Sequence, residues 1–181
     1  MNETYESLSY DGIPLLGMLG EVELPLVESL GPYWRFGALW KGNFISDCAH
    51  IPVFGFQAAS FDVESGQREQ YVVAGDRNMD IGWEGDFPAK KSARFGTSYQ
   101  IWTDRFPKCG QVVFRNVTEE SHLVIWNGYK ERGSLNESVA NNCLTWKQIG
   151  PHEWRMWAHG GTSPPTMKSV VFRVKLIPNS E

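Results

Sequence analysis

The stretch from Glu153 to His159 holds the residues whose types and spacing are best suited to chemistry. In a strand, alternate side chains lie on opposite faces. One face would carry Glu153, Arg155, Trp157 and His159, and the other would carry Trp154, Met156 and Ala158. If the first face lines a closed interior, a cation and an imidazole beside an indole could bind a carboxylate or enolate and move a proton. If the second face is the buried one, the cation and the imidazole are solvated. We favour this second alternative and keep the first as the catalytic hypothesis.

Two carboxylates are candidate general bases, because burial against an apolar wall would raise the pKa of either one. Asp104 shares a strand face with Gln100 and Trp102, opposite Tyr99 and Ile101, and Glu84 lies near the end of another predicted strand. The candidate catalytic residues are therefore His159, Arg155, Asp104 and Glu84.

Metal and cofactor chemistry has little support in the sequence. The four histidines show no close ligand pairing, and there is no glycine-rich phosphate loop or nucleophile elbow. Cys48 and His50 would share one face of a strand, and we interpret this spacing as a contact without a catalytic role. The sequence therefore predicts no metal and no cofactor.

Aromatic residues are abundant, at 13% of the chain with eight tryptophans. Such side chains offer large apolar area with a polar edge, and those that do not form the core are candidates to contact a ligand. His122, Val124 and Trp126 would share one strand face, with His122 at a rim after a turn. The candidate ligand-binding residues are Trp34, Phe36, Trp40, Trp83, Trp102, Trp126, Trp146 and Trp157.

The elements that must position these residues are strands. Three aromatic and β-branched runs between residues 98 and 129, separated by two short polar breaks, predict an antiparallel meander. Period-two patterns predict further strands over 34–46, 52–63, 68–74, 79–84, 143–149, 153–159 and 169–177. Short helices are expected after Pro25 and at the capping box that begins at Ser134.

This pattern predicts an all-β fold. Because an up-and-down meander exposes edges unless it closes, we expect a single antiparallel barrel of about 8–10 strands with one or two short helices. A β-sandwich or jelly roll is the alternative. The expected division is an N-terminal arm with a short helix at residues 1–31 and a barrel domain at residues 32–181.

The segment Gly31-Pro-Tyr-Trp34 opens the first predicted strand after a predicted short helix. In this respect the chain resembles the lipocalin-like (calycin) β-barrels, whose first strand begins with Gly-x-Trp. Here the spacing is Gly-x-x-Trp, one residue longer, and the family's long C-terminal helix is missing. The resemblance covers the topology of residues 25–177 and implies a cup for an apolar small molecule.

The net charge and the targeting signals limit which classes of partner and which cellular compartment are expected. A net charge of −4 and a pI near 5.6 lack the basic footprint of a nucleic-acid binder. No apolar run approaches the ~20 residues of a membrane span, and the first residues lack the apolar region of a secretory signal. We expect a cytoplasmic protein, with secretion left open for a trimmed chain. Three cysteines favour free thiols in a reducing compartment, with one disulfide as the alternative.

Three functions remain from the sequence. The first is a barrel that binds an apolar or aromatic small molecule, as a simple binder or as a cofactor-independent cyclase or isomerase acting through shape and a few polar groups. The second is a carbohydrate-binding sandwich, for which Trp83, Trp126 or Tyr129 on one flat face would be a sign. The third is a structural or interaction module. Whether the protein is an enzyme, and whether it forms a homodimer, are left open.

Overall fold

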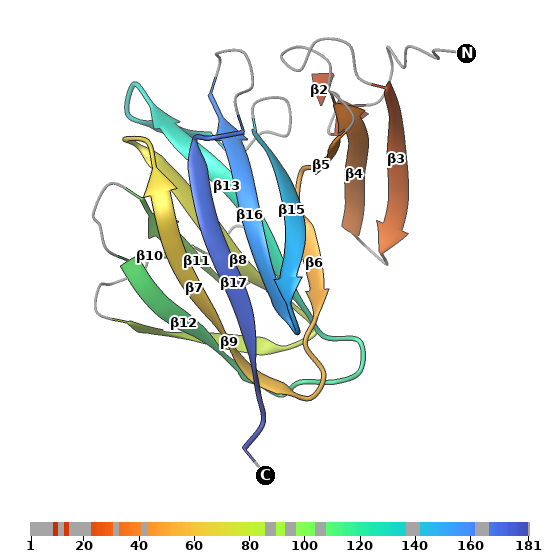
Figure 1. Ribbon diagram of the computed structural model, residues 1–181, viewed down its shortest axis with the longest axis vertical. Helices are drawn as coiled ribbons and strands as arrows, with labels where there is room; N and C mark the ends of the chain where they lie inside the picture. The colour runs from red at the N-terminus through yellow and green to blue at the C-terminus, as the bar shows by residue number, and fades with distance from the viewer. Residues whose placement is uncertain are drawn as a thin grey trace.

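The chain is built from β-strands. The computed structural model describes residues 9–10, 13–14, 23–30, 33–40, 43–85, 90–92, 97–103, 108–136, 142–161 and 167–180. Within these ranges every regular element is a strand, and neighbouring strands are antiparallel (Figure 1). The predicted all-β class is therefore confirmed.

The larger sheet contains nine strands in the order β3-β4-β5-β15-β16-β17-β7-β12-β9. Its members are β3 (Glu23–Leu30), β4 (Tyr33–Trp40), β5 (Asn43–Ser46), β7 (Phe56–Gly66), β9 (Asp80–Gly85), β12 (Lys108–Arg115), β15 (Asn142–Gly150), β16 (Glu153–Gly160) and β17 (Val170–Pro178). β17 pairs with β16 on one side and with β7 on the other, so a strand late in the chain lies inside the sheet.

The smaller sheet contains six strands. Its members are β6 (Ala49–Pro52), β8 (Gln70–Arg77), β10 (Lys90–Ser92), β11 (Ser98–Trp102), β13 (His122–Glu131) and β14 (Ser134–Asn136). β8 lies between β11 and β13, and β6 and β14 pair with different parts of β13. A separate pair is formed by β1 (Ser9–Tyr10) and β2 (Ile13–Pro14).

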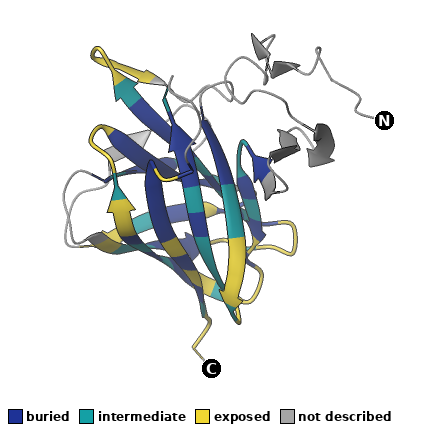
Figure 2. Ribbon diagram, turned by 45° about the horizontal axis from the view of Figure 1, so that its top comes forward, coloured by how far each residue is buried: buried dark blue, intermediate teal, exposed yellow. Residues whose placement is uncertain are grey.

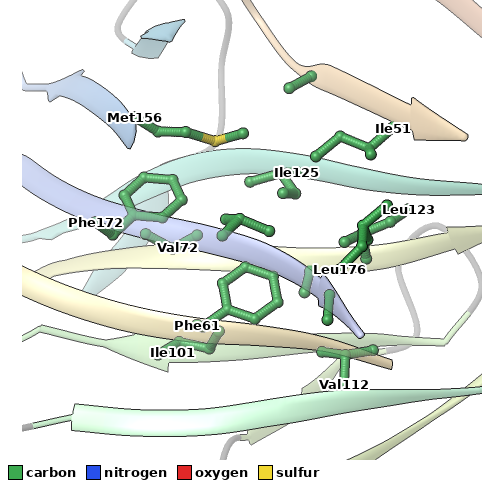
Figure 3. Close-up of a cluster of buried hydrophobic side chains, with 14 of the residues drawn as sticks. Ile51, Phe61, Val72, Ile101, Val112, Leu123, Ile125, Met156, Phe172 and Leu176 are labelled. Carbon is green, nitrogen blue, oxygen red and sulfur yellow. The ribbon is translucent and has the colours of Figure 1, made fainter. Parts of the chain in front are cut away.

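The two large sheets share one apolar core. Buried side chains from both sheets meet in one cluster, as Figure 3 shows for Phe61 and Phe172 of the larger sheet and Val72 and Ile125 of the smaller one. Phe61 and Phe172 are each no more than 1% exposed. Figure 2 shows the buried residues concentrated along the middle of the strands, with exposed residues at their ends and turns. The space between the layers is thus occupied by side chains.

The sequence pattern explains why these segments are strands. In β17, Val170, Phe172, Val174 and Leu176 are buried, whereas Arg173 and Lys175 are exposed, as simple alternation requires. The hairpin between β13 and β14 turns through Arg132 and Gly133, which both have positive φ, at 49° and 86°. A two-residue hairpin loop favours this conformation because its twist matches that of the strands.

The predicted meander of residues 98–129 is wrong. β11 and β13 both pair with β8 in the smaller sheet, whereas β12 pairs with β7 and β9 in the larger one. The break at residues 118–121 therefore joins strands of two different sheets and is not a hairpin turn, whereas Lys108, Cys109 and Gly110 of the other predicted break lie within β12. None of the sheets closes on itself in the described residues, so the single up-and-down barrel is not confirmed, and neither is the calycin resemblance.

The expected short helices are also not found in the described residues. Residues 23–30 form strand β3, which pairs with β4, and residues 134–136 form strand β14. In both places pairing with a neighbouring strand outweighs the local helix signal, which is weak for so few residues. The predicted boundary between an arm and a main domain at residues 31 and 32 stays a prediction.

Candidate functional site

The four predicted catalytic residues do not form one site. Arg155 and His159 lie on β16, on the face away from the core, because Met156 and Ala158 point into it. Glu84 is exposed on β9, about 19 Å or four strand spacings away across the sheet, and accepts a hydrogen bond from Gln111 at 2.8 Å. Asp104 lies outside the described residues.

Arg155 belongs to an exposed network of charges. Its guanidinium donates hydrogen bonds to Glu64 at 2.6 and 2.9 Å and lies 5.3 Å from the ring centre of Trp157. Arg173 contacts the same glutamate at 3.2 Å and also pairs with Asp62. We call this surface of the larger sheet the charged face; its residues are Asp62, Glu64, Glu153, Arg155, Trp157, Arg173 and Lys175. Its two arginines are already paired with carboxylates.

His159 is 3% exposed, at the end of β16. On the inner side of the same end, buried amides join the two sheets. Asn127 of β13 donates to the His159 carbonyl at 2.7 Å, and Gln70 of β8 donates to the Gly160 carbonyl at 3.1 Å. The side-chain oxygens of Gln70 and Asn127 are buried and have no hydrogen-bond partner among the described residues. Because buried amide oxygens are usually satisfied, this is a place where ordered water would bind.

The predicted ligand-binding aromatics lie on several different surfaces. Trp83 and Trp146 are partly buried and pack against the core, and Trp157 lies on the charged face. Trp34, Phe36 and Trp40 lie on β4, where only the backbone is described. Trp102 and Trp126 lie together on the outer side of the smaller sheet. Among the predicted aromatics whose side chains are described, Trp102 and Trp126 are thus the pair that shares the outer side of one sheet.

The outer side of the smaller sheet forms what we call the aromatic face. Its residues alternate with the core residues Val72, Ala74, Ile101, Leu123 and Ile125, so they point away from the core. They are Tyr71, Val73 and Gly75 of β8, Ser98, Gln100 and Trp102 of β11, and Val124, Trp126 and Gly128 of β13. Trp102, Val124 and Trp126 are half-buried and the other six are buried. These nine residues are uncharged, but Lys130 follows Gly128 on the same side of β13, and Lys90 of β10 pairs with Gln100.

Two glycines allow aromatic rings to lie flat on this face. A Cβ atom at Gly75 would come within 2.6 Å of the Trp126 ring, and one at Gly128 would come within 2.5 Å of the Tyr71 ring. Each ring therefore lies across the neighbouring strand in place of a side chain. Tyr71 also contacts Trp102, with ring centres 4.7 Å apart. The result is a row of rings across three strands, with Trp102 and Trp126 half-buried and Tyr71 beneath them at 0% exposure.

Histidines lie at one end of the aromatic face. His122 Nδ1 is 3.0 Å from the Glu120 carbonyl oxygen, which can only accept, so Nδ1 carries the proton and Nε2 is an acceptor in the neutral ring. The His50 ring lies beside it, with ring centres 6.3 Å apart. Cys48 Sγ is 3.3 Å from His50 Nε2, so the two residues that share a strand face in the sequence are in contact.

Sequence alternation identified part of this face. It grouped Gln100 with Trp102, and His122 with Val124 and Trp126, and both groups point outward as described above. It missed Tyr71 and the role of the two glycines, because the strand that carries Tyr71 and Gly75 was not known to lie between the other two. The glycines within the two strand patterns, Gly75 and Gly128, were the available signal, because a glycine inside a strand often marks the close approach of another group.

Other site chemistry is limited in the described part of the chain. No three His, Cys, Asp or Glu side chains gather there in a way that could bind a metal ion. No helix of the length and apolarity needed to span a membrane occurs there either. Burial raises the pKa of the Cys143 thiol to about 12, so this buried sulfur stays protonated at neutral pH.

Comparison of the chain with family models, with curated proteins and with solved structures gave no match.

Proposed function

We propose that the protein is a carbohydrate-binding β-sandwich and that the aromatic face holds the sugar. The observation that carries the proposal is the pair of half-buried indoles, Trp102 and Trp126, on an uncharged face where glycines let rings lie flat. A sugar ring presents C–H groups on its faces, which pack against the π-face of an indole through dispersion and weak electrostatic attraction. The residues next to the two indoles, Tyr71, Val73 and Gly128, are uncharged, which favours neutral sugars.

Polar contacts to sugar hydroxyls would come from the rim of the face. His122 offers Nε2 as an acceptor, since its Nδ1 donates to the Glu120 carbonyl. The indole N–H of Trp102 is a donor of the kind that binds hydroxyls at the edge of a stacked ring. Donors and acceptors around flat aromatic rings are the chemistry that a neutral sugar needs.

The alternative function, binding of an apolar molecule inside a calycin-like barrel, has weaker support. The space between the sheets holds Phe61, Phe172, Met156 and their buried neighbours, and the sheets have open edges in the described residues. An apolar ligand would need that space. We infer that the fold is a two-layer sandwich and that a ligand binds on its surface.

The proposal is tested by measuring binding of the full chain to soluble neutral β-glucan, xylan and mannan, with alginate as an anionic comparison. Affinity electrophoresis and titration calorimetry would detect binding of at least one neutral polysaccharide. Trp126→Ala and Trp102→Ala are each expected to weaken that binding by about fivefold or more, the equivalent of one lost aromatic contact of ~1 kcal/mol.

Trp157→Ala is the matched control, because this indole lies on the charged face on the other side of the molecule. It should bind the same polysaccharide as tightly as the unsubstituted protein. Circular dichroism would verify that each variant is folded. Failure to bind any neutral polysaccharide, or an equal loss in the Trp157 variant, would contradict the proposal and favour a protein-interaction module.

A further inference from the structure

Cys48 and His50 form a thiol–imidazole pair at the start of β6. The Cys48 sulfur lies 3.3 Å from His50 Nε2, and both side chains are half-buried and reachable from solvent. The two residues are on the same side of the chain because Ala49 between them points into the core. Strand alternation places the two side chains in contact, and the imidazole gives the Cys48 thiol a reactivity that an isolated thiol does not have.

An imidazole at hydrogen-bond distance changes the reactivity of a thiol. Nε2 can accept the S–H proton, which leaves a thiolate next to an imidazolium, and the thiolate is the nucleophilic form of cysteine. Asp47 Oδ1 lies 3.5 Å from the same sulfur and accepts the Cys48 backbone N–H at 2.9 Å. Its negative charge opposes a thiolate but favours the imidazolium. His122, on β13, also lies beside His50, with ring centres 6.3 Å apart.

The other two cysteines provide internal references. Cys143 is buried, and its raised pKa makes it unreactive at neutral pH. Cys109, on β12, is exposed, and no hydrogen bond in the described residues involves its side chain. The chain therefore holds one protected thiol, one accessible thiol without a base, and one half-buried thiol in contact with a base.

We propose that Cys48 is a reactive thiol, activated by His50, that forms a mixed disulfide with low-molecular-weight disulfides such as glutathione disulfide. The proton of Cys48 passes to His50 Nε2. The thiolate attacks one sulfur of the small disulfide, a new S–S bond forms as the old one breaks, and the departing thiolate takes the electron pair of the broken bond. It then receives the proton from the imidazolium, which returns His50 to its neutral form. The small disulfide is the oxidant, so no other reactant is needed.

The experiment compares the three cysteines in the same folded protein. The full chain is incubated with glutathione disulfide at pH 7, and modification is followed at each cysteine by peptide mass spectrometry. Cys48 is expected to react about tenfold faster than Cys109, the increase in thiolate fraction expected when a base lowers a thiol's pKa by one unit. With iodoacetamide, the rate of Cys48 should level off about one pH unit lower than the rate of Cys109 as the pH is raised from 6 to 10.

His50→Gln removes the base while it keeps a polar side chain of similar size. It should reduce the Cys48 rate to that of Cys109 and give Cys48 the same pH profile as Cys109. His152→Asn, at an exposed histidine on the turn between β15 and β16, is the control and should leave the rate unchanged. Equal rates for Cys48 and Cys109 in the unsubstituted protein would overturn the proposal without any variant. A His50→Gln protein that is folded and reacts at the original rate would overturn the role of His50.

Discussion

At the scale of single residues, glycine positions decide how the aromatic face is built. Gly75 and Gly128 lack the Cβ atoms that would collide with the rings of Trp126 and Tyr71. Both glycines are buried within regular strands, where glycine weakens pairing because it has no side chain to pack. Their presence there is explained by the close approach of the rings.

Gly75→Ala tests this explanation without removing an aromatic residue. The new methyl group would lie 2.6 Å from the Trp126 ring, so we expect the indole to swing away from the face and its fluorescence maximum to shift to longer wavelength. Binding of a neutral polysaccharide should weaken along with it. Gly82→Ala is the matched control, because its nearest new contact, at 3.6 Å to Arg115, is an ordinary one. Unchanged fluorescence in Gly75→Ala would show that the ring does not lie over this glycine.

Asp76 provides a test of pH dependence. Burial is the main cause that raises the pKa of its carboxyl, with a smaller contribution from the charge of Asp80, while backbone N–H groups of Asp76 and Thr97 act in the opposite direction. A carboxyl with a raised pKa in the folded protein stabilises the fold most when it is protonated, and this contribution is lost as the pH rises through the folded-state pKa. We therefore expect Asp76→Asn to raise the melting temperature at pH 7.

The gain should shrink as the pH falls into the acidic range in which the raised pKa lets the wild-type carboxyl become protonated as well. Calorimetric melting of both proteins across this pH range measures the difference. A gain that is constant with pH would assign the effect to packing of the amide and not to ionisation.

At the scale of elements, β7 has one side in the core and the other in the charged network. Glu64 is the extra residue of a bulge, since its neighbours Val63 and Ser65 pair with the adjacent residues Phe172 and Val171 of β17. The bulge directs the carboxylate of Glu64 towards Arg155 and Arg173. Phe61, three residues earlier, points the other way into the core.

The two sides of β7 should therefore respond differently to substitution. Glu64→Gln is expected to change the free energy of unfolding by no more than about 1 kcal/mol, because both of its arginine partners are more than 40% exposed. Phe61→Ala should reduce it by about 3–5 kcal/mol, because it leaves a cavity between the layers. Urea denaturation measures both. A larger effect from Glu64 than from Phe61 would mean that the charged network, and not the core, holds this strand.

The strands themselves were largely predictable from the sequence, but their partners were not. Period-two alternation in residues 170–177 or 122–129 shows which side chains share a face. It carries no information on which distant strand completes the sheet, and a polar break of four residues suits a hairpin as well as a crossing between layers. The aromatic face was therefore recognisable only as separate fragments, because β8 had to be placed between β11 and β13 to unite them.

At the scale of the whole molecule, the proposed two-layer sandwich makes a prediction that a closed barrel does not. β7, β8, β13 and β17 each have strand neighbours on both sides, whereas β9 and β10 lie at the ends of their sheets in the described residues. Hydrogen exchange followed by mass spectrometry should find the slowest backbone amides in the first group and faster exchange in β9 and β10. A closed barrel has no edge strands, so equal protection of β9 and β17 would contradict the two-layer fold.

The position of β17 between β16 and β7 affects how the larger sheet assembles while the chain is being synthesised. A nascent chain leaves the ribosome with β7 and β16 already synthesised, but these strands cannot join until the segment that separates them has emerged. The larger sheet then remains in two parts until residues 170–178 have been synthesised, with unpaired backbone groups on both sides of the gap. Such open edges invite pairing with other chains, so the protein depends on rapid insertion of this segment, or on chaperones, to avoid aggregation during synthesis.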